Sequence, residues 1–97
     1  MKALPFDYDL SDKLKGIIEK LRKKDSKRTD LIYKKIKQII NCDETTIEHY
    51  KNLRHDLSDR KRARINKSFV LTFKFDKKTK FILFLDFDHH DNIYKKF

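Results

Sequence analysis

The fold is decided by residues 60–97, RKRARINKSFVLTFKFDKKTKFILFLDFDHHDNIYKKF. Residues 62–65 alternate between arginine and apolar side chains, and residues 69–75 alternate between large apolar side chains and other residue types. A period of two is typical of strands that bury one face. Residues 81–85 are apolar at every position, which predicts a strand covered on both faces. The polar segments between these strands predict turns, so the whole stretch indicates an antiparallel meander.

Two amphipathic helices are predicted ahead of this sheet. Ser11 is a predicted N-cap, and the apolar residues after it recur at helical spacing. A second helix is predicted from Lys27 to about Asn41, and Asp43 is a predicted cap for a short third helical turn. Two helices with a short connection form an antiparallel hairpin, and one apolar stripe from each packs on the other or on a sheet.

The N-terminal part contains the only glycine and the only proline of the chain. Gly16 weakens the first helix by about 1 kcal/mol relative to alanine, and close packing against a neighbour is a candidate reason for it. Residues 1–8 predict a short edge strand, interrupted by Pro5, which has no N–H to donate. The sequence therefore predicts a single α+β domain over residues 1–97. In this domain an N-terminal helical hairpin packs on a small, mainly antiparallel, twisted sheet.

The charge balance predicts an anionic partner. The chain has 25 Lys and Arg against 15 Asp and Glu, a formal net charge of +10. Such a charge attracts RNA, DNA, an anionic membrane or an acidic protein, although a lysine-rich solvated surface gives the same composition. Lone Cys42 excludes an internal disulfide, and no apolar run approaches the ~20 residues of a membrane span. With no signal-peptide pattern, we expect a cytoplasmic protein without a membrane partner.

Arg62 and Arg64 form a candidate phosphate clamp. They lie on the same face of their predicted strand, and a planar guanidinium binds phosphate oxygens bidentately. The alternative is a solvated edge strand, where cations prevent aggregation. Further cations near this strand or in the tail are expected to contact RNA: Arg60, Lys61, Lys67, Lys95 and Lys96.

His89 and His90 follow the last predicted strand and are candidate proton-transfer groups. Imidazole titrates near neutral pH, and RNA cleavage by the internal 2′-hydroxyl needs a base, an acid and positive charge. Tyr94 is a candidate for stacking on a base. Structural or merely exposed histidines, and a Tyr94 that packs at the chain end, are the alternatives. A metal site is a further alternative, although its spacing fits no standard motif: Asp86, Asp88, His89, His90 and Asp91. His49 and His55 are isolated. His55 follows Arg54 in a polar loop and is placed where it could approach the site, although such a residue is more commonly on the surface.

These segments, in their order, resemble the RelE/ParE toxin superfamily. Its members commonly show a Leu-(Lys/Arg)-Gly element, an alternating basic strand, an aromatic-aliphatic strand and an ending similar to His-Arg-x-x-(Ile/Val)-Tyr-Lys. The corresponding segments are residues 53–57, 61–65, 69–73 and 82–95. The resemblance covers nearly the whole chain by pattern, and its specific part is the second half.

The resemblance implies a RelE-like endoribonuclease, which is the toxin of a type II toxin–antitoxin pair. RelE-like members cut mRNA in the ribosomal A site and need no metal or other cofactor. Arg62 and Arg64 match the basic residues that hold the phosphate. His89 matches the histidine of the tail motif, and Tyr94 matches the tail tyrosine, which contacts the RNA at the cut in some members.

Three positions depart from the superfamily pattern. His55 replaces the common glycine, Val70 stands where many RelE-like toxins carry an active-site arginine, and His90 stands where arginine or lysine is frequent. The expected partners are mRNA on the ribosome, ribosomal RNA and a cognate acidic antitoxin, which wraps the basic sheet or displaces the final helix or tail. The alternatives are a ParE-like toxin that acts on DNA gyrase and a non-catalytic basic module that binds RNA or DNA.

Overall fold

A five-stranded sheet with order β1-β5-β4-β3-β2 organises the chain. The computed structural model describes the backbone of residues 6–54 and 57–96, and the side chains of residues 6–52 and 60–93. All neighbouring strands are antiparallel except β1 and β5, which are parallel. The elements are β1 (Asp7–Leu10), α1 (Asp12–Lys24), α2 (Ser26–Ile40), α3 (Glu44–His49), β2 (Asn52–Arg54), β3 (Leu57–Ile65), β4 (Phe69–Asp76), β5 (Phe81–His89) and α4 (His90–Lys96).

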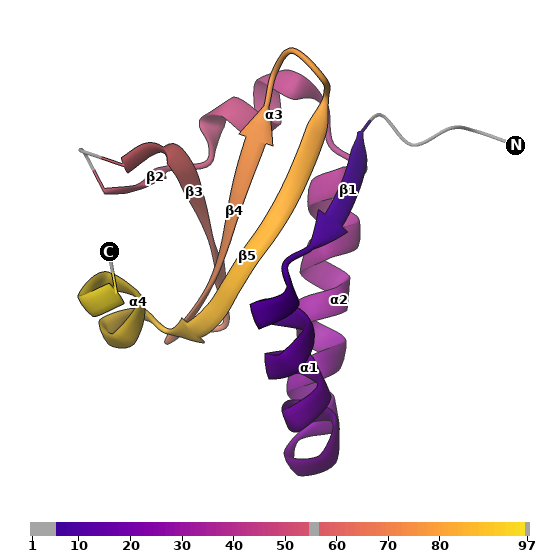
Figure 1. Cartoon of the computed structure of the whole chain (residues 1–97), viewed down its shortest axis with the longest axis vertical. Coiled ribbons are helices and arrows are strands. Elements are labelled where there is room, and N and C mark those ends of the chain that lie inside the picture. The colour runs from indigo at the N-terminus through magenta and orange to yellow at the C-terminus, as the bar shows by residue number, and fades with distance from the viewer. Residues whose placement is uncertain (1–5, 55–56, 97) are drawn as a thin grey trace, which may run out of the picture.

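The helical hairpin of α1 and α2 covers one face of the sheet (Figure 1). Its apolar stripes pack against the apolar side chains of β3, β4 and β5, and this contact forms the core. The hairpin does not cover the opposite face of the sheet. The predicted α+β class and mainly antiparallel sheet are confirmed. None of the helices in the described ranges is long and apolar enough to cross a bilayer.

Capping residues start the helices where the sequence predicts them. The Ser11 hydroxyl accepts a hydrogen bond from the Leu14 amide at 3.1 Å and donates one to the Leu85 carbonyl at 2.6 Å. The first contact caps α1, and the second fixes the beginning of α1 to β5. Asp43 caps α3 by accepting a hydrogen bond from the Thr46 amide at 2.8 Å. This cap fixes where α3 begins, ahead of the segment that leads to β2.

Three predictions about the strands and Gly16 require correction. Within β5, Ile82 and Phe84 are fully buried while Leu83 is half-buried, so this strand is not covered on both faces. The reason is that the hairpin covers one face of the sheet only. The N-terminal strand extends to Leu10 rather than ending at Tyr8: its described part is Asp7–Leu10, which pairs with β5, and residues 1–5 lie outside the described range. Close packing at Gly16 is wrong, since a Cβ there would meet no atom within 4 Å.

Candidate active site

The face of the sheet away from the hairpin carries the arginines of β3. Alternation along the strand directs Ala63 and Ile65 into the core, where they are 1% and 4% exposed. Arg62 and Arg64 therefore lie on the opposite face. The register places Arg62 beside Thr72 and Arg64 beside Val70 on β4. Both arginines thus lie on the strand face opposite Ala63 and Ile65, as the alternation predicts, and Arg64 also borders a second hollow against α2.

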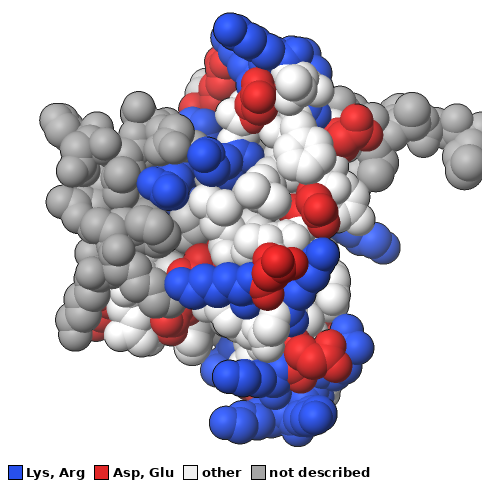
Figure 2. Space-filling model, in the orientation of Figure 1, with Lys and Arg blue, Asp and Glu red and all other residues white. Residues whose placement is uncertain are grey.

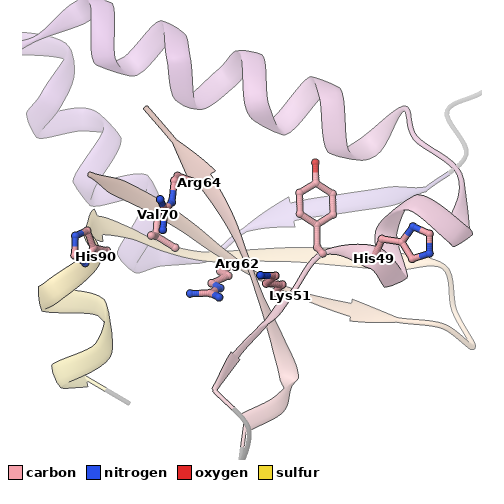
Figure 3. A pocket seen from close by; sticks show the side chains of 7 residues that line it. His49, Lys51, Arg62, Arg64, Val70 and His90 are labelled. Atoms are coloured by element: carbon pink, nitrogen blue, oxygen red, sulfur yellow. The ribbon is translucent and has the colours of Figure 1, made fainter. Parts of the chain in front are cut away.

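An open pocket of about 430 Å³ lies over these arginines (Figure 3). Its walls come from α3, the segment between α3 and β2, strands β3 and β4, and the first residue of α4. The lining residues are His49, Tyr50, Lys51, Arg62, Arg64, Val70 and His90. Three of the predicted catalytic residues, Arg62, Arg64 and His90, thus meet at one pocket from two separate segments of the chain.

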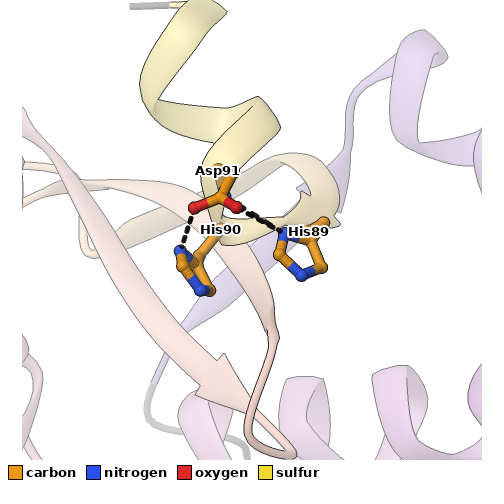
Figure 4. A group of neighbouring side chains, drawn as sticks. All are labelled: His89, His90 and Asp91. Carbon is orange, nitrogen blue, oxygen red and sulfur yellow. Dashed lines mark hydrogen bonds and ion pairs between the residues drawn. The ribbon is translucent and has the colours of Figure 1, made fainter.

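His90 is held in the pocket by two contacts. Its backbone amide donates to the Ser68 carbonyl at 2.8 Å, which fixes the first residue of α4 to the turn between β3 and β4. Its Nδ1 lies 2.9 Å from Oδ1 of Asp91 (Figure 4). This contact engages one ring nitrogen of His90, and Nε2 is the ring nitrogen that it leaves for contact with a ligand.

His89 occupies a different environment from His90. Its register partner on β4 is Phe69, and the two rings meet edge-on with centroids 5.8 Å apart. The guanidinium of Arg28, on α2, lies 4.2 Å from the centre of the Phe69 ring. The His89 ring also stacks on the His90 ring at 4.7 Å. The structure therefore separates the two histidines: His90 lines the pocket, while His89 packs between Phe69 and His90.

Only one group among the described residues has the residue types and the spacing of a metal site. One potential ligand atom each from His89, His90 and Asp91 lies within 4.8 Å of the others. Contacts inside the group accompany this arrangement, since the Asp91 carboxylate lies against His90 Nδ1 and the Asp91 amide donates a hydrogen bond to His89 Nδ1 at 3.3 Å. The other members of the metal alternative are engaged elsewhere. Asp86 is buried and pairs with Lys13 at 3.2 Å, and Asp88 accepts from the His89 amide at 2.7 Å.

The predicted RNA-contacting cations are dispersed. Lys61 lies on the other face of β3 from the arginines, and its ammonium contacts the segment between α3 and β2. Arg60 lines a separate hollow with Lys13 and Asp86, and Lys67 is exposed in the turn between β3 and β4. Figure 2 shows Lys and Arg side chains spread over the visible face, with Asp and Glu between them. The side chains of Tyr94, Lys95 and Lys96, and the whole of His55, lie outside the described part of the chain.

Sequence reasoning missed the wall of the pocket formed by residues 49–51. His49 is isolated in the sequence and received no role, and Lys51 carries no local motif. Tyr50 also lines the pocket, and its ring meets that of the buried Phe73 edge-on at 5.5 Å. Burial raises the pKa of the Tyr50 phenol, with a smaller contribution from Cys42, so this phenol stays neutral at physiological pH. The one sequence signal for this wall is the neighbouring cap at Asp43, which predicts where α3 begins.

Comparison with known proteins identifies the family. No family model matches the chain. A protein of Methanocaldococcus jannaschii named "Putative toxin RelE4" is 47% identical over 91 residues, which cover 94% of this chain and 93% of that protein. An uncharacterised protein of Methanosarcina mazei is 35% identical over 85 residues, which cover 88% of this chain and 94% of that protein.

A solved structure shares the fold. The crystal structure of the toxin–antitoxin complex RelBE2 from Mycobacterium tuberculosis matches with a TM-score of 0.58 at 18% identity, over 89% of this chain and 99% of that chain. The chain is therefore a small α+β protein with the fold found in that complex, a helical hairpin on a mainly antiparallel sheet. The identity to the Methanocaldococcus protein makes the assignment specific: the chain belongs to the RelE toxin family. The resemblance stated from the sequence is confirmed.

Proposed function

We propose that this chain is the toxin of a type II toxin–antitoxin pair and that it cuts mRNA on the ribosome without a metal ion. One observation carries the proposal: Arg62, Arg64 and His90 line the same pocket although they come from different elements. Two fixed cations and an oriented imidazole are the groups that attack by an internal 2′-hydroxyl requires. Membership of the RelE family supports the same activity.

The mechanism assigns His90 as the general base. Its Nε2 accepts the proton of the 2′-hydroxyl, while Asp91 holds the ring through Nδ1. The O2′–P bond forms and the P–O5′ bond breaks, which leaves a 2′,3′-cyclic phosphate on one fragment and a 5′-hydroxyl on the other. Arg62 and Arg64 donate hydrogen bonds to the non-bridging oxygens, whose negative charge increases in the transition state. In this proposal the proton for O5′ comes from Tyr94, which lies one helical turn after His90 in α4.

Val70 explains why the pocket contains two arginines rather than three. Many RelE-like toxins carry an active-site arginine at this position, and here the valine lies in the pocket beside Arg64. Its side chain is 2% exposed, so it packs into the sheet and adds no charge. The proposal therefore assigns the stabilisation of the phosphate to Arg62 and Arg64 alone among the described residues that line the pocket.

The test is to map cleavage of a translated mRNA on programmed ribosomes and to determine the chemistry of the new 3′ ends. We expect 2′,3′-cyclic phosphate ends, cuts that persist in EDTA, and rates that fall at least 100-fold in Arg64→Ala and His90→Gln. Lys20→Ala, an exposed substitution on α1, is the matched control and should cut at the wild-type rate. Absence of cuts, loss of cuts in EDTA, or equal rates in His90→Gln and the control would refute the proposal. Inhibition of DNA gyrase supercoiling without RNA cleavage would favour the ParE-like alternative instead.

The proposed protein partner is an acidic antitoxin. The net charge of +10 favours an anionic partner, and the RelBE2 structure contains a toxin with its antitoxin. A neighbouring reading frame that encodes a small acidic protein should relieve growth inhibition when the two are expressed together. Failure of such a protein to bind the purified chain would contradict this part of the proposal.

A further inference from the structure

The pocket extends past the proposed catalytic groups to a second basic end. In Figure 3, His90 and Arg64 lie at one end, Lys51 and His49 lie toward the other, and Arg62 lies between them. The catalytic proposal uses the first end and the middle only. Both Lys51 and His49 are exposed side chains that line the same open pocket. A pocket with cations along its length fits a strand with several phosphates better than it fits a single phosphate.

Backbone contacts fix Lys51 next to the central arginine. The Arg62 amide donates to the Lys51 carbonyl at 3.0 Å, which continues the pairing of β2 with β3 by one residue. The position of Lys51 relative to Arg62 is thus set by main-chain geometry, even though both side chains are long. A ligand that contacts Arg62 is therefore within the range of the Lys51 side chain.

Lys61 holds the same wall from the other side of β3. Its ammonium lies 3.4 Å from the Glu48 carbonyl, 3.1 Å from the Tyr50 carbonyl and 3.4 Å from Oδ1 of Asn52. These three contacts bracket both His49 and Lys51. They also satisfy carbonyl groups at the end of α3 that have no partner inside the helix. Lys61 is therefore placed to position the wall rather than to contact a ligand in the pocket.

Three ion contacts secure α3 at its other side. The Lys77 ammonium lies 2.9 Å from Glu48 and 4.0 Å from Glu44, and Lys80 also pairs with Glu44. These contacts join α3 to the turn between β4 and β5. The hydrogen bond and the charge of Lys77 hold the pKa of the Glu48 carboxyl below its usual range, so the pair is ionised at physiological pH. The wall that carries Lys51 is thus attached to the sheet at two points.

We propose that Lys51, with His49 beyond it, forms a second phosphate subsite for single-stranded RNA, and that Lys61 is the positioning residue for this subsite. The inference rests on the proposed function and deepens it: the substrate is a strand whose flanking phosphate is bound while the adjacent linkage lies between Arg62, Arg64 and His90. Lys51 then contributes to binding of substrate and transition state alike, so its loss raises KM and leaves kcat unchanged.

The test is binding of 2′-O-methyl oligouridylates, which cannot be cut by 2′-hydroxyl attack. Fluorescence anisotropy would give Kd for oligomers of two, four and eight nucleotides over a range of salt concentrations. For the longer oligomers, we expect Lys51→Ala to raise Kd about 2- to 5-fold and to lower the salt slope by about 0.7, the values for one exposed phosphate contact. For the dinucleotide, which is too short to reach both ends, Kd should equal that of the wild type. Lys20→Ala is again the matched control.

Lys61→Met tests the positioning role, because it removes the ammonium and keeps most of the stem. For the longer oligomers we expect Lys61→Met to raise Kd as much as Lys51→Ala does, and the double variant to raise it no further. Lys61→Arg, which retains donors at this position, should restore the wild-type Kd. If Lys61→Met does not fold, the single variant at Lys51 still decides the proposal. An unchanged Kd in Lys51→Ala, or an equal loss for all three oligomer lengths, would overturn the second subsite. These assays do not depend on cleavage, so their outcome is separate from that of the nuclease test.

Discussion

Gly16→Ala is predicted to stabilise this protein. Gly16 lies in the middle of α1 and is exposed, its φ is not positive, and a Cβ built on it meets no atom within 4 Å. The substitution therefore gains helix propensity without a steric cost. Glycine is about 0.8–1 kcal/mol less favourable than alanine inside a helix, and part of this difference arises from the freedom of glycine in the unfolded chain. For a domain of this size the gain corresponds to a rise in Tm of roughly 4–8 °C.

Urea unfolding followed by circular dichroism measures this gain directly. With an m-value of about 1–1.5 kcal/mol/M, the midpoint should shift upward by roughly 0.5–1 M. Gly16→Gln provides a second test, because open space around the Cβ predicts that a longer side chain with high helix propensity also stabilises. A variant with an inactivated site should be used as the background, so that expression does not depend on toxicity. An unchanged or lowered midpoint in both variants would refute the reasoning, since it would require a close neighbour at Gly16.

Two further predictions concern the site and its supports. Asp91→Asn should lower kcat on programmed ribosomes roughly 10- to 100-fold with KM little changed, because the proposal has Asp91 orient the His90 imidazole. If Asn92→Ala, a change at the next residue, lowered kcat by a similar factor, this role of Asp91 would be wrong. Lys77→Met should raise the pKa of Glu48 toward its ordinary value of 4.5, as measured by NMR titration. The pKa of Glu48 is lowered in the folded state, so the contact stabilises the fold above pH 4.5 and this contribution is lost as the pH falls through the folded pKa. The wild type should therefore lose this contribution in acid, whereas the variant, which lacks it at every pH, should show a weaker acid dependence.

The parts of the fold that the sequence predicts well are those decided by local patterns. Ser11 and Asp43 cap helices because their side chains satisfy amides within the next three residues, a relation that depends only on spacing. Alternation alone separates Arg62 from Ala63, because successive side chains in a strand point to opposite faces. These relations depend on nearby residues only and do not require knowledge of contacts between distant segments.

The parts that sequence reasoning missed depend on contacts between distant segments. The pocket wall at Lys51 exists because β2 pairs with β3, and no local signal at residue 51 reports that pairing. Lys61 was grouped with the other cations by charge, although its place on β3 directs it to the other face. The sequence could not distinguish the roles of His89 and His90, because both are histidines. The difference between them comes from the register of β5, which pairs His89 with Phe69.

The column formed by Arg28, Phe69, His89 and His90 has a consequence for how the two sides of the sheet communicate. The Arg28 guanidinium lies over the Phe69 ring, the His89 ring meets the edge of that ring, and the His90 ring stacks on His89. A molecule that binds α2 and moves Arg28 away from Phe69 would remove the cation–π contact at the far end of this column. We therefore expect that a ligand which displaces Arg28 from Phe69 can shift His90, the proposed base, without entering the pocket.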